Sequence, residues 1–212
     1  MKKSILSLLA VAAITASCNQ APDAAKAETT EKQQAAAAEG ATYSINTEES
    51  TIGWIGTKPV GQHHGEFKLS SGSLAVAEGN VTGGNFIIDI HSIKNFDLTD
   101  DSNGKLVGHL KSGDFLDAEK HPTAKFEITK VDLLQNDTSG THKVSGNLTL
   151  RDSTKNVTFP ARIVVTENDV TANANFNIDR TQWGLFYGND QSLGDKFIRP
   201  EVNLTLNIKA RK

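Results

Sequence analysis

Apolar and polar residues alternate one by one along most of the chain after residue 42. Near the C-terminus the apolar positions of this pattern are Val202, Leu204, Leu206 and Ile208. Because successive side chains of a strand point to opposite faces, a period of two predicts an antiparallel strand with one buried face. The pattern predicts eight or nine strands, near residues 43–47, 50–57, 65–77, 81–92, 124–134, 142–151, 156–166, 169–179 and 201–210.

One segment interrupts the alternation. Leu106 and Leu110 stand at helical spacing, Phe115 and Leu116 follow, and Pro122 ends the segment. This spacing predicts a short helical connection near residues 102–120. The other connections are short and polar, and the amphipathic crossover helices of a parallel sheet are missing. The chain is therefore predicted to be all-β, an extended antiparallel β-barrel of about eight strands, whose closure leaves no unpaired sheet edge.

The first 18 residues have the features of an export signal followed by a lipid-attachment site. Lys2 and Lys3 precede about ten mostly apolar residues, a run too short to span a membrane. Residues 15–18 read Thr-Ala-Ser-Cys and resemble a bacterial lipobox, and Cys18 is the only cysteine of the chain. We therefore expect residues 1–17 to be a lipoprotein signal peptide and a lipidated Cys18 to anchor the protein to a membrane. The alternative is an ordinary secreted protein with a free thiol.

The next segment, residues 18–41, contains no large apolar side chain and is rich in alanine, glutamine, glutamate and threonine. Such a segment cannot bury enough surface to offset the entropy of ordering it. We therefore predict a disordered tether over residues 18–41 and a folded barrel domain over residues 42–212. On this organisation the protein is expected in the bacterial cell envelope, tethered to a membrane and facing the periplasm or the cell surface.

Charge and residue spacing disfavour nucleic-acid binding, metal binding and catalysis. The net charge is -3 at pH 7, and no basic stripe marks a nucleic-acid surface. The six histidines show no HxH or HxxxH spacing, and the adjacent His63 and His64 point to opposite faces of a strand. No GxSxG nucleophile motif is present. We therefore assign no catalytic residue, no metal site and no cofactor. An envelope enzyme that uses His64, His109 or Asp117 is the weaker alternative.

Six stretches of the domain also have a characteristic order and spacing. They are STIGWIGTK at 50–58, HHGEFKLSSGSL at 63–74, GGNFIIDIHSI at 83–93, LVGHLKSGDFLDAEKHPTAKFE at 106–127, VSGNLTLRDSTKNVTFP at 144–160 and FNIDRTQWGLFY at 176–187. Together they resemble the YceI-like family of bacterial exported proteins. The resemblance implies a lipocalin-like barrel around a long apolar tunnel that holds a polyisoprenoid lipid, such as an isoprenoid quinone.

The function implied by this resemblance is the non-enzymatic binding, storage or transport of that lipid. A structural or partner-binding envelope lipoprotein with a filled barrel is the alternative, because alternation alone does not distinguish a hollow interior from a packed one. The sequence leaves open the identity of the lipid and whether two barrels associate as a homodimer.

The candidate lining of such a tunnel consists of the inward-facing strand residues, the apolar residues of the helical connection and the aromatic residues after residue 180. These candidate ligand-binding residues are Trp54, Phe67, Phe86, Ile88, Ile90, Leu106, Leu110, Phe115, Leu116, Phe126, Ile128, Leu148, Leu150, Phe176, Ile178, Trp183, Phe186 and Tyr187. Structural roles are predicted for Asp179, Arg180 and Gly184, with Arg180 donating several hydrogen bonds and Gly184 turning the chain. Trp183 is predicted to close one end of the barrel together with Phe186.

Overall fold

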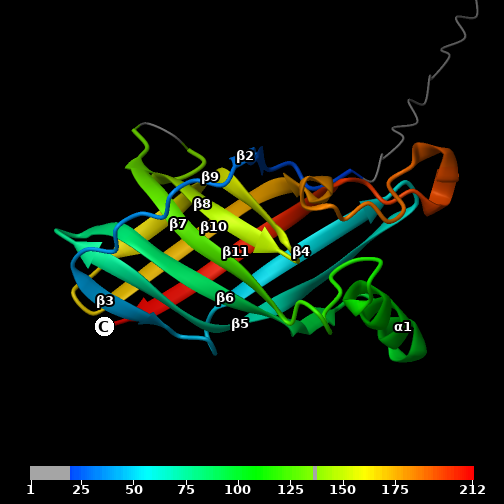
Figure 1. The fold of residues 1–212 in the computed structure, drawn as a ribbon, viewed down its shortest axis with the longest axis horizontal. Coiled ribbons are helices and arrows are strands. Elements are labelled where there is room, and N and C mark those ends of the chain that lie inside the picture. The colour runs from blue at the N-terminus through cyan, green and yellow to red at the C-terminus, as the bar shows by residue number, and fades with distance from the viewer. Residues whose placement is uncertain (1–19, 136–137) are drawn as a thin grey trace, which may run out of the picture.

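Eight antiparallel strands close into a barrel in the computed structural model, which describes residues 20–135 and 138–212 (Figure 1). The strands are β4 (Thr51–Lys58), β5 (Gly61–Ala77), β6 (Asn80–Asn95), β7 (Thr123–Leu133), β8 (His142–Leu150), β9 (Ser153–Val165), β10 (Asp169–Asp179) and β11 (Glu201–Arg211). Each strand pairs with the next along the chain, and β11 pairs with β4 to close the circle. The predicted all-β barrel is confirmed. The predicted signal peptide and Cys18 lie outside the described residues.

The two ends of the barrel are built differently (Figure 1). One end, which we call the helix end, carries α1 (Asp100–Lys111) and the connection from β10 to β11. That connection contains two short 3₁₀ helices, η1 (Arg180–Trp183) and η2 (Gln191–Lys196). The opposite end, the turn end, carries the short β5–β6 and β9–β10 turns and the additional strand β3 (Ala41–Ile45). Strand β3 pairs with both β5 and β11 and so extends the wall beyond the start of β4.

The helical connection consists of one helix followed by turns. Acidic residues in the first turn of α1, Asp100 and Asp101, and basic residues in its last turn, His109 and Lys111, complement the helix dipole. After the helix the backbone turns back on itself, and the Ala118 amide donates to the Lys111 carbonyl at 2.8 Å. No residue of α1 is buried, because the helix lies at one end of the barrel and not within it. Among the described residues, no helix is both long enough and apolar enough to cross a membrane.

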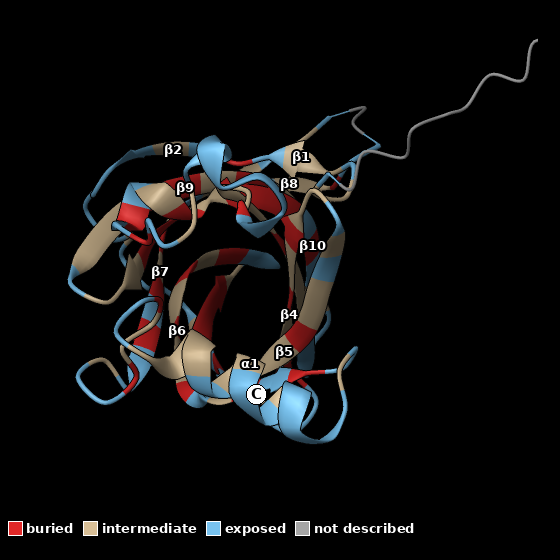
Figure 2. Cartoon of the chain, turned by 90° about the vertical axis from the view of Figure 1, so that its right-hand side faces the viewer, coloured by how far each residue is buried: buried red, intermediate tan, exposed pale blue. Residues whose placement is uncertain are grey.

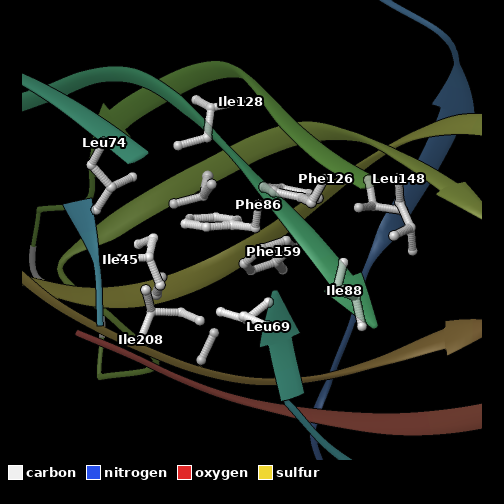
Figure 3. Close-up of a cluster of buried hydrophobic side chains, with 14 of the residues drawn as sticks. Ile45, Leu69, Leu74, Phe86, Ile88, Phe126, Ile128, Leu148, Phe159 and Ile208 are labelled. Atoms are coloured by element: carbon white, nitrogen blue, oxygen red, sulfur yellow. The ribbon is translucent and has the colours of Figure 1, made fainter. Parts of the chain in front are cut away.

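Four phenylalanines from neighbouring strands meet inside the barrel, and we call them the aromatic floor. The ring centroids of Phe86 and Phe126 lie 6.0 Å apart, and those of Phe126 and Phe159 lie 5.9 Å apart. The rings of Phe159 and Phe176 are stacked at 3.9 Å. Gly146, on the strand between β7 and β9, makes room for this arrangement, because a Cβ atom there would lie 2.2 Å from the Phe126 ring. Figure 3 shows Phe86, Phe126 and Phe159 pointing toward one another among aliphatic side chains.

Between the aromatic floor and the turn end, the interior is packed with side chains. The buried residues of this half include Tyr43, Ile45, Leu74, Val76, Val81, Ile128, Val144, Ala161, Val170 and Ala210. The hydroxyl of Tyr43 donates to the Glu167 carbonyl at 2.9 Å, which ties β3 to the β9–β10 turn. This half of the barrel therefore has a conventional hydrophobic core.

Residues 22–40 form a belt across the outside of the barrel, so the predicted disordered tether is wrong for this segment (Figure 2). The belt contains β1 (Ala25–Lys26), parallel to β10, and β2 (Glu28–Glu31), antiparallel to β9. Strands β9 and β10 pair directly only at residues 162–165 and 170–173, and the belt fills the gap between them toward the helix end. Farther on, the Ala36 amide donates to the Ile128 carbonyl at 3.0 Å.

Buried asparagines beneath the belt explain why a segment without large apolar residues is ordered. Asn147 is 2% exposed, accepts a hydrogen bond from the Gln33 amide at 3.0 Å and donates to the Gln33 carbonyl at 2.7 Å. Asn177 donates to the Pro22 carbonyl at 3.0 Å, and its own carbonyl accepts from the Ala27 amide at 2.8 Å. A buried amide without partners costs about 1–3 kcal/mol. The belt is therefore held by hydrogen bonds to the strands more than by apolar burial.

Candidate functional site

A cavity of about 480 Å³ lies inside the barrel between the aromatic floor and the helix end. Small-molecule sites typically measure about 300–1,000 Å³, so this volume accommodates a ligand. Most of the predicted lining residues surround it: Trp54, Phe67, Phe86, Ile88, Ile90, Leu106, Leu110, Phe115, Leu116, Phe126, Leu148, Leu150, Phe176, Ile178 and Tyr187. The inward-facing apolar side chains therefore leave a hollow in this half of the barrel.

The aromatic floor separates this cavity from a much smaller one. The second cavity, of about 40 Å³, lies on the turn-end side of the floor. Five residues line both cavities: Phe86, Phe126, Phe159, Leu206 and Ile208. The large cavity is therefore a blind tunnel that ends where these side chains meet.

The wall of the tunnel becomes polar toward the helix end. Its polar and charged lining residues are Thr57, Lys58, His63, His109, Arg180, Tyr187, Asp195, Lys196 and Arg199. All of them belong to the β4–β5 hairpin, to α1 or to the connection between β10 and β11. The remaining lining residues are apolar or glycine. The tunnel thus offers apolar surroundings along its depth and hydrogen-bonding groups at its opening.

Several lining residues were missed by the sequence analysis. Those on strands are Ile52, Ile93, Ala124, Val157, Phe159, Val202, Leu204, Leu206 and Ile208. The alternation in β11 already marks its four apolar residues as one face, so this signal could have identified them. Leu185 and Ile198 also line the tunnel, but they lie in the irregular connection, where no periodicity marks them.

Three predicted lining residues lie away from the tunnel. Ile128 is on the turn-end side of the aromatic floor, where it lines the small cavity, because β7 continues past the floor. Trp183 is buried, but η1 directs its indole nitrogen to the Leu148 carbonyl at 2.8 Å and its ring does not line the tunnel. Phe186 is 58% exposed, because the chain reverses at Gly184 and carries the ring outward. The predicted plug of Trp183 with Phe186 therefore does not form.

Arg180 holds the connection between β10 and β11 in place. Its buried guanidinium donates to the carbonyls of Tyr187 and Ile198 at 2.9 Å each. It also donates to the carbonyls of Arg199, at 3.3 Å, and Leu185. Burial lowers the pKa of Arg180 from its ordinary value. The structure places Arg180 in the hydrogen-bonding role that the sequence predicted, next to the polar part of the tunnel wall.

Asp179 and Gly184 shape the backbone on either side of η1. The Asp179 carboxylate accepts hydrogen bonds from the amide of Thr181 at 2.9 Å and from its hydroxyl at 2.6 Å. Gly184 has a φ of 77°, in the left-handed region that glycine adopts without strain. Neither residue lines the tunnel.

The residues named for the enzyme alternative do not form one site. His64 pairs with Asp97 at 3.5 Å, and His109 pairs with Asp114 at 2.8 Å. Asp117 forms an ion pair with a neighbouring lysine, and of the three candidates only His109 lines the tunnel. In residues 20–135 and 138–212, no three His, Cys, Asp or Glu side chains gather as a metal site would require.

Asp97 organises the histidine pair beside the opening. Burial acts to raise the pKa of Asp97, but hydrogen bonds outweigh it and hold the pKa below its ordinary value. These bonds come from the His64 amide at 2.8 Å, the His63 ring at 2.7 Å and the Asn95 side chain at 2.5 Å. The carboxylate therefore fixes the start of β5 against the end of β6.

Comparison with known proteins places the sequence in one family. A family model described as the YceI-like domain matches residues 43–210. A UPF0312 protein of Vibrio parahaemolyticus is 33% identical over 132 residues, which are 61% of this chain and 62% of that protein. A UPF0312 protein of Pseudomonas paraeruginosa is 34% identical over 106 residues, 50% of this chain and 51% of that protein. The chain thus matches less than two thirds of the length of these relatives.

Solved structures share the fold at low sequence identity. Burkholderia cenocepacia BcnA matches with a TM-score of 0.62 and 18% identity, over 78% of this chain and 99% of that chain. A polyisoprenoid binding domain from Saccharophagus degradans, implicated in plant cell wall breakdown, matches with a TM-score of 0.60 and 14% identity. The match covers 80% of this chain and 97% of that chain. At these identities the likeness shows the fold alone.

Proposed function

The chain belongs to the YceI-like family, and on that premise we propose that it binds a polyisoprenoid lipid, such as an isoprenoid quinone, and stores or transports it without catalysing a reaction. The observation that carries the proposal is the blind apolar tunnel of about 480 Å³. The Saccharophagus degradans neighbour, a polyisoprenoid binding domain, supports the same ligand class. A long branched hydrocarbon chain matches a deep cavity whose wall is apolar except at its opening.

The ligand lies with its tail toward the aromatic floor and its head group at the helix end. Burial of the tail contributes about 25 cal/mol per Å² of apolar surface removed from water, opposed by the ordering of the tail. The head group keeps hydrogen-bonding partners, because the polar lining residues gather at the opening. The reverse orientation would place polar atoms against Phe86 and Phe126, which offer no hydrogen bonds.

The filled-barrel alternative is disfavoured by the same cavity. A packed interior requires side chains from opposite walls to meet along its whole length. In this barrel they meet at and beyond the aromatic floor, and again at the opening where Tyr187 contacts His109 and Phe115, but a cavity of about 480 Å³ stays open between these two levels. The enzyme alternative has no cluster of acid, base and nucleophile to support it among the described residues. Lipid binding therefore remains the function that the geometry favours.

Organic extraction of the purified protein followed by lipid mass spectrometry tests the proposal. We expect a long-chain isoprenoid lipid to co-purify with the protein, or an added long-chain quinone to bind to lipid-free protein. A lipid-free preparation with no affinity for an added quinone would overturn the proposal.

Two neighbouring residues of β6 provide a matched pair of variants. Ile88 is buried and lines the tunnel, whereas Ile87 is half-buried and points away from it. Ile88→Trp fills part of the tunnel with an indole ring and should lower quinone affinity at least tenfold. Ile87→Trp adds the same ring to the outer face and should leave the affinity unchanged. Equal affinity of the two variants would contradict binding inside the tunnel.

We also propose that a lipidated Cys18 holds the protein in the bacterial cell envelope. The lipobox-like sequence before this cysteine supports the assignment. Metabolic labelling with a fatty acid should mark the wild-type protein and not Cys18→Ser. Equal labelling of both forms would exclude the anchor.

A further inference from the structure

Large apolar side chains are exposed around the opening of the tunnel, and we call them the apolar rim. They are Val60, Phe96, Phe186, Tyr187 and Leu193. They come from the β4–β5 turn, from the residue after β6 and from the connection between β10 and β11, all at the helix end. Tyr187 also lines the tunnel, so the rim is continuous with the tunnel wall. Apolar side chains gathered on one exposed face are typical of sites that contact a protein or a membrane.

The N-terminal part of the belt lies at the same end of the barrel. Pro22 is hydrogen-bonded to Asn177, which stands three residues before Arg180 of the tunnel wall. Lys26 forms an ion pair at 3.5 Å with Glu201, the first residue of β11 at the helix end. In Figure 1 the blue start of the described chain accordingly lies toward the end that carries α1 and η2.

This placement limits how far the barrel can move from an anchored Cys18. Only three residues, 19 to 21, separate Cys18 from Pro22, so the two are four residue steps apart. Four residues of fully extended chain span at most about 14 Å. A free tether up to residue 41 would let the barrel turn in any direction, whereas the docked belt keeps the helix end near the attachment point.

We propose that the apolar rim docks on the surface of a phospholipid bilayer, so that the lipid passes between bilayer and tunnel without crossing water. This inference rests on the proposed lipid-binding function. The rim belongs to the opening through which the ligand must pass, and the short link to Cys18 keeps that opening toward the anchoring membrane. Charges of both signs stand at this end: Lys58, Lys196 and Arg199 line the opening together with Asp195, and Asp97 pairs with His63 of the wall. Apolar contact is therefore expected to contribute more to docking than net charge. Docking should therefore depend weakly on salt and on anionic lipid.

The test compares the rim with equally exposed apolar residues at the turn end. Phe96 and Phe186 are 55% and 58% exposed, whereas Leu133 and Val164 at the other end are 67% and 52% exposed. The double variants are Phe96→Ser with Phe186→Ser, and Leu133→Ser with Val164→Ser. All proteins begin at residue 18, which keeps every described element, and carry Cys18→Ser so that no anchor contributes.

Three measurements are made on each protein. Docking is measured by co-flotation with vesicles. One set of vesicles contains phosphatidylcholine, and the other contains phosphatidylethanolamine and phosphatidylglycerol. Transfer of a long-chain isoprenoid quinone from these vesicles measures exchange, and uptake of the same quinone from detergent micelles measures tunnel binding alone. The rim variant should lose about tenfold or more in vesicle partitioning and transfer rate, because each exposed phenylalanine contributes apolar contact area. The turn-end variant should match the parent protein, and micelle uptake should be the same in all three.

Two results would overturn the inference. One is equal flotation and transfer by the rim and turn-end variants. The other is a change of oligomeric state by light scattering in the rim variant alone, which would show that a second copy of the chain covers the rim. Failure of all proteins to take up quinone from micelles would instead refute the proposed function, and flotation would still decide whether the rim binds a bilayer.

Discussion

The half of the barrel at the helix end is hollow, whereas the half at the turn end is packed. Both interiors are lined by alternating apolar residues of the same strands, and both are enclosed by the same hydrogen-bonded wall. The cavity measures about 480 Å³ on one side of the aromatic floor and about 40 Å³ on the other. A pattern of inward-facing apolar residues therefore does not decide whether a barrel is filled.

The reach of the side chains decides it instead. At the floor, phenylalanines from β6, β7, β9 and β10 extend far enough to contact one another. Gly146 on the intervening strand provides the space that the Phe126 ring occupies. Toward the helix end the wall carries aliphatic side chains together with Gly56, Thr57, Trp54 and Phe67, and these leave about 480 Å³ open between them. One ring of aromatic residues thus converts a continuous core into a core and a binding site.

The largest effect is expected from truncating the floor. Phe159 is 3% exposed and contacts the rings of both Phe126 and Phe176. Phe159→Ala should lower the free energy of unfolding by about 3–5 kcal/mol, because it removes a buried aromatic ring and leaves a cavity. Phe67→Ala, in the hollow half, should cost less than half as much, because the half-buried ring of Phe67 already borders empty space. Urea unfolding followed by tryptophan fluorescence measures both.

If Phe159→Ala and Phe67→Ala lowered the free energy of unfolding equally, the two halves of the barrel would not differ in packing. The floor variant should also connect the two cavities and allow the tunnel to accept a longer isoprenoid chain than the parent protein accepts. A series of quinones of increasing tail length, measured by native mass spectrometry, checks this second consequence.

The next effect concerns glycine positions in the two halves. A Cβ atom at Gly146 would lie 2.2 Å from the Phe126 ring, whereas one at Gly56 would meet no atom within 4 Å. Gly146→Ala should therefore destabilise the fold by about 3 kcal/mol, near the upper end of the usual range for overpacking. Gly56→Ala, on the tunnel wall, should change the free energy of unfolding by less than about 1 kcal/mol. Comparable losses at both positions would show that the hollow half is as tightly packed as the floor.

The belt crosses the outside of both halves. The hydrogen bonds between Asn147 and Gln33 provide a test of what holds the belt on the barrel. Asn147→Ala removes two hydrogen bonds to Gln33 and one to Asn156, and should cost about 1–2 kcal/mol. Asn173→Ala, at an exposed position of β10, is the control and should change stability by less than about 0.5 kcal/mol. Hydrogen exchange should show the loss of protection concentrated in residues 22–40. Unchanged protection there would mean that the asparagine does not hold the belt.

The smallest effect is a difference in pH dependence between the two ends. Burial lowers the pKa of His142, near the turn end, below its ordinary value of 6.5. As the pH falls, His142 therefore becomes protonated in the unfolded chain before it does so in the folded protein. The stability contributed by neutral His142 is complete above about pH 6.5 and is lost as the pH falls through the pKa of the folded state. Asp97, at the helix end, also has a lowered pKa, but its contribution is complete above its ordinary value of 3.8 and is lost only below it.

Acidification should therefore lower the free energy of unfolding first through His142 and only at lower pH through Asp97. Urea unfolding as a function of pH should show the upper step disappear in His142→Gln and the lower step disappear in Asp97→Asn. Retention of the upper step in His142→Gln would assign it to another group.

The strands could be predicted from the sequence because their signal is local. Alternation placed β10 at residues 169–179 and β11 at residues 201–210, and the structure has Asp169–Asp179 and Glu201–Arg211. The belt could not be predicted in this way. Its own residues carry no apolar pattern, and its order comes from hydrogen bonds with Asn147 and Asn177, which lie far away in the sequence.

The sequence predicted which side chains point into the barrel, but not on which side of the aromatic floor each of them lies. Alternation identified Phe126 and Ile128 as inward-facing, and both do face inward, yet only Phe126 lines the large cavity. Which side of the floor a residue occupies depends on the register between strands, which alternation does not contain. Leu185 and Ile198 were missed because the hydrogen bonds of Arg180, and not a repeating pattern, set the path of their segment.

The belt also sets the order of events when the chain folds. Gln33 and Asn147 are 114 residues apart, and Pro22 and Asn177 are 155 residues apart. The ribosome makes residues 22–40 before the strands that receive them, and these strands exist only after most of the domain has been made. Contacts between such distant residues slow folding, because a long loop must close before they form. Docking of the belt can therefore be completed only after β8 and β10, which supply Asn147 and Asn177, have been made.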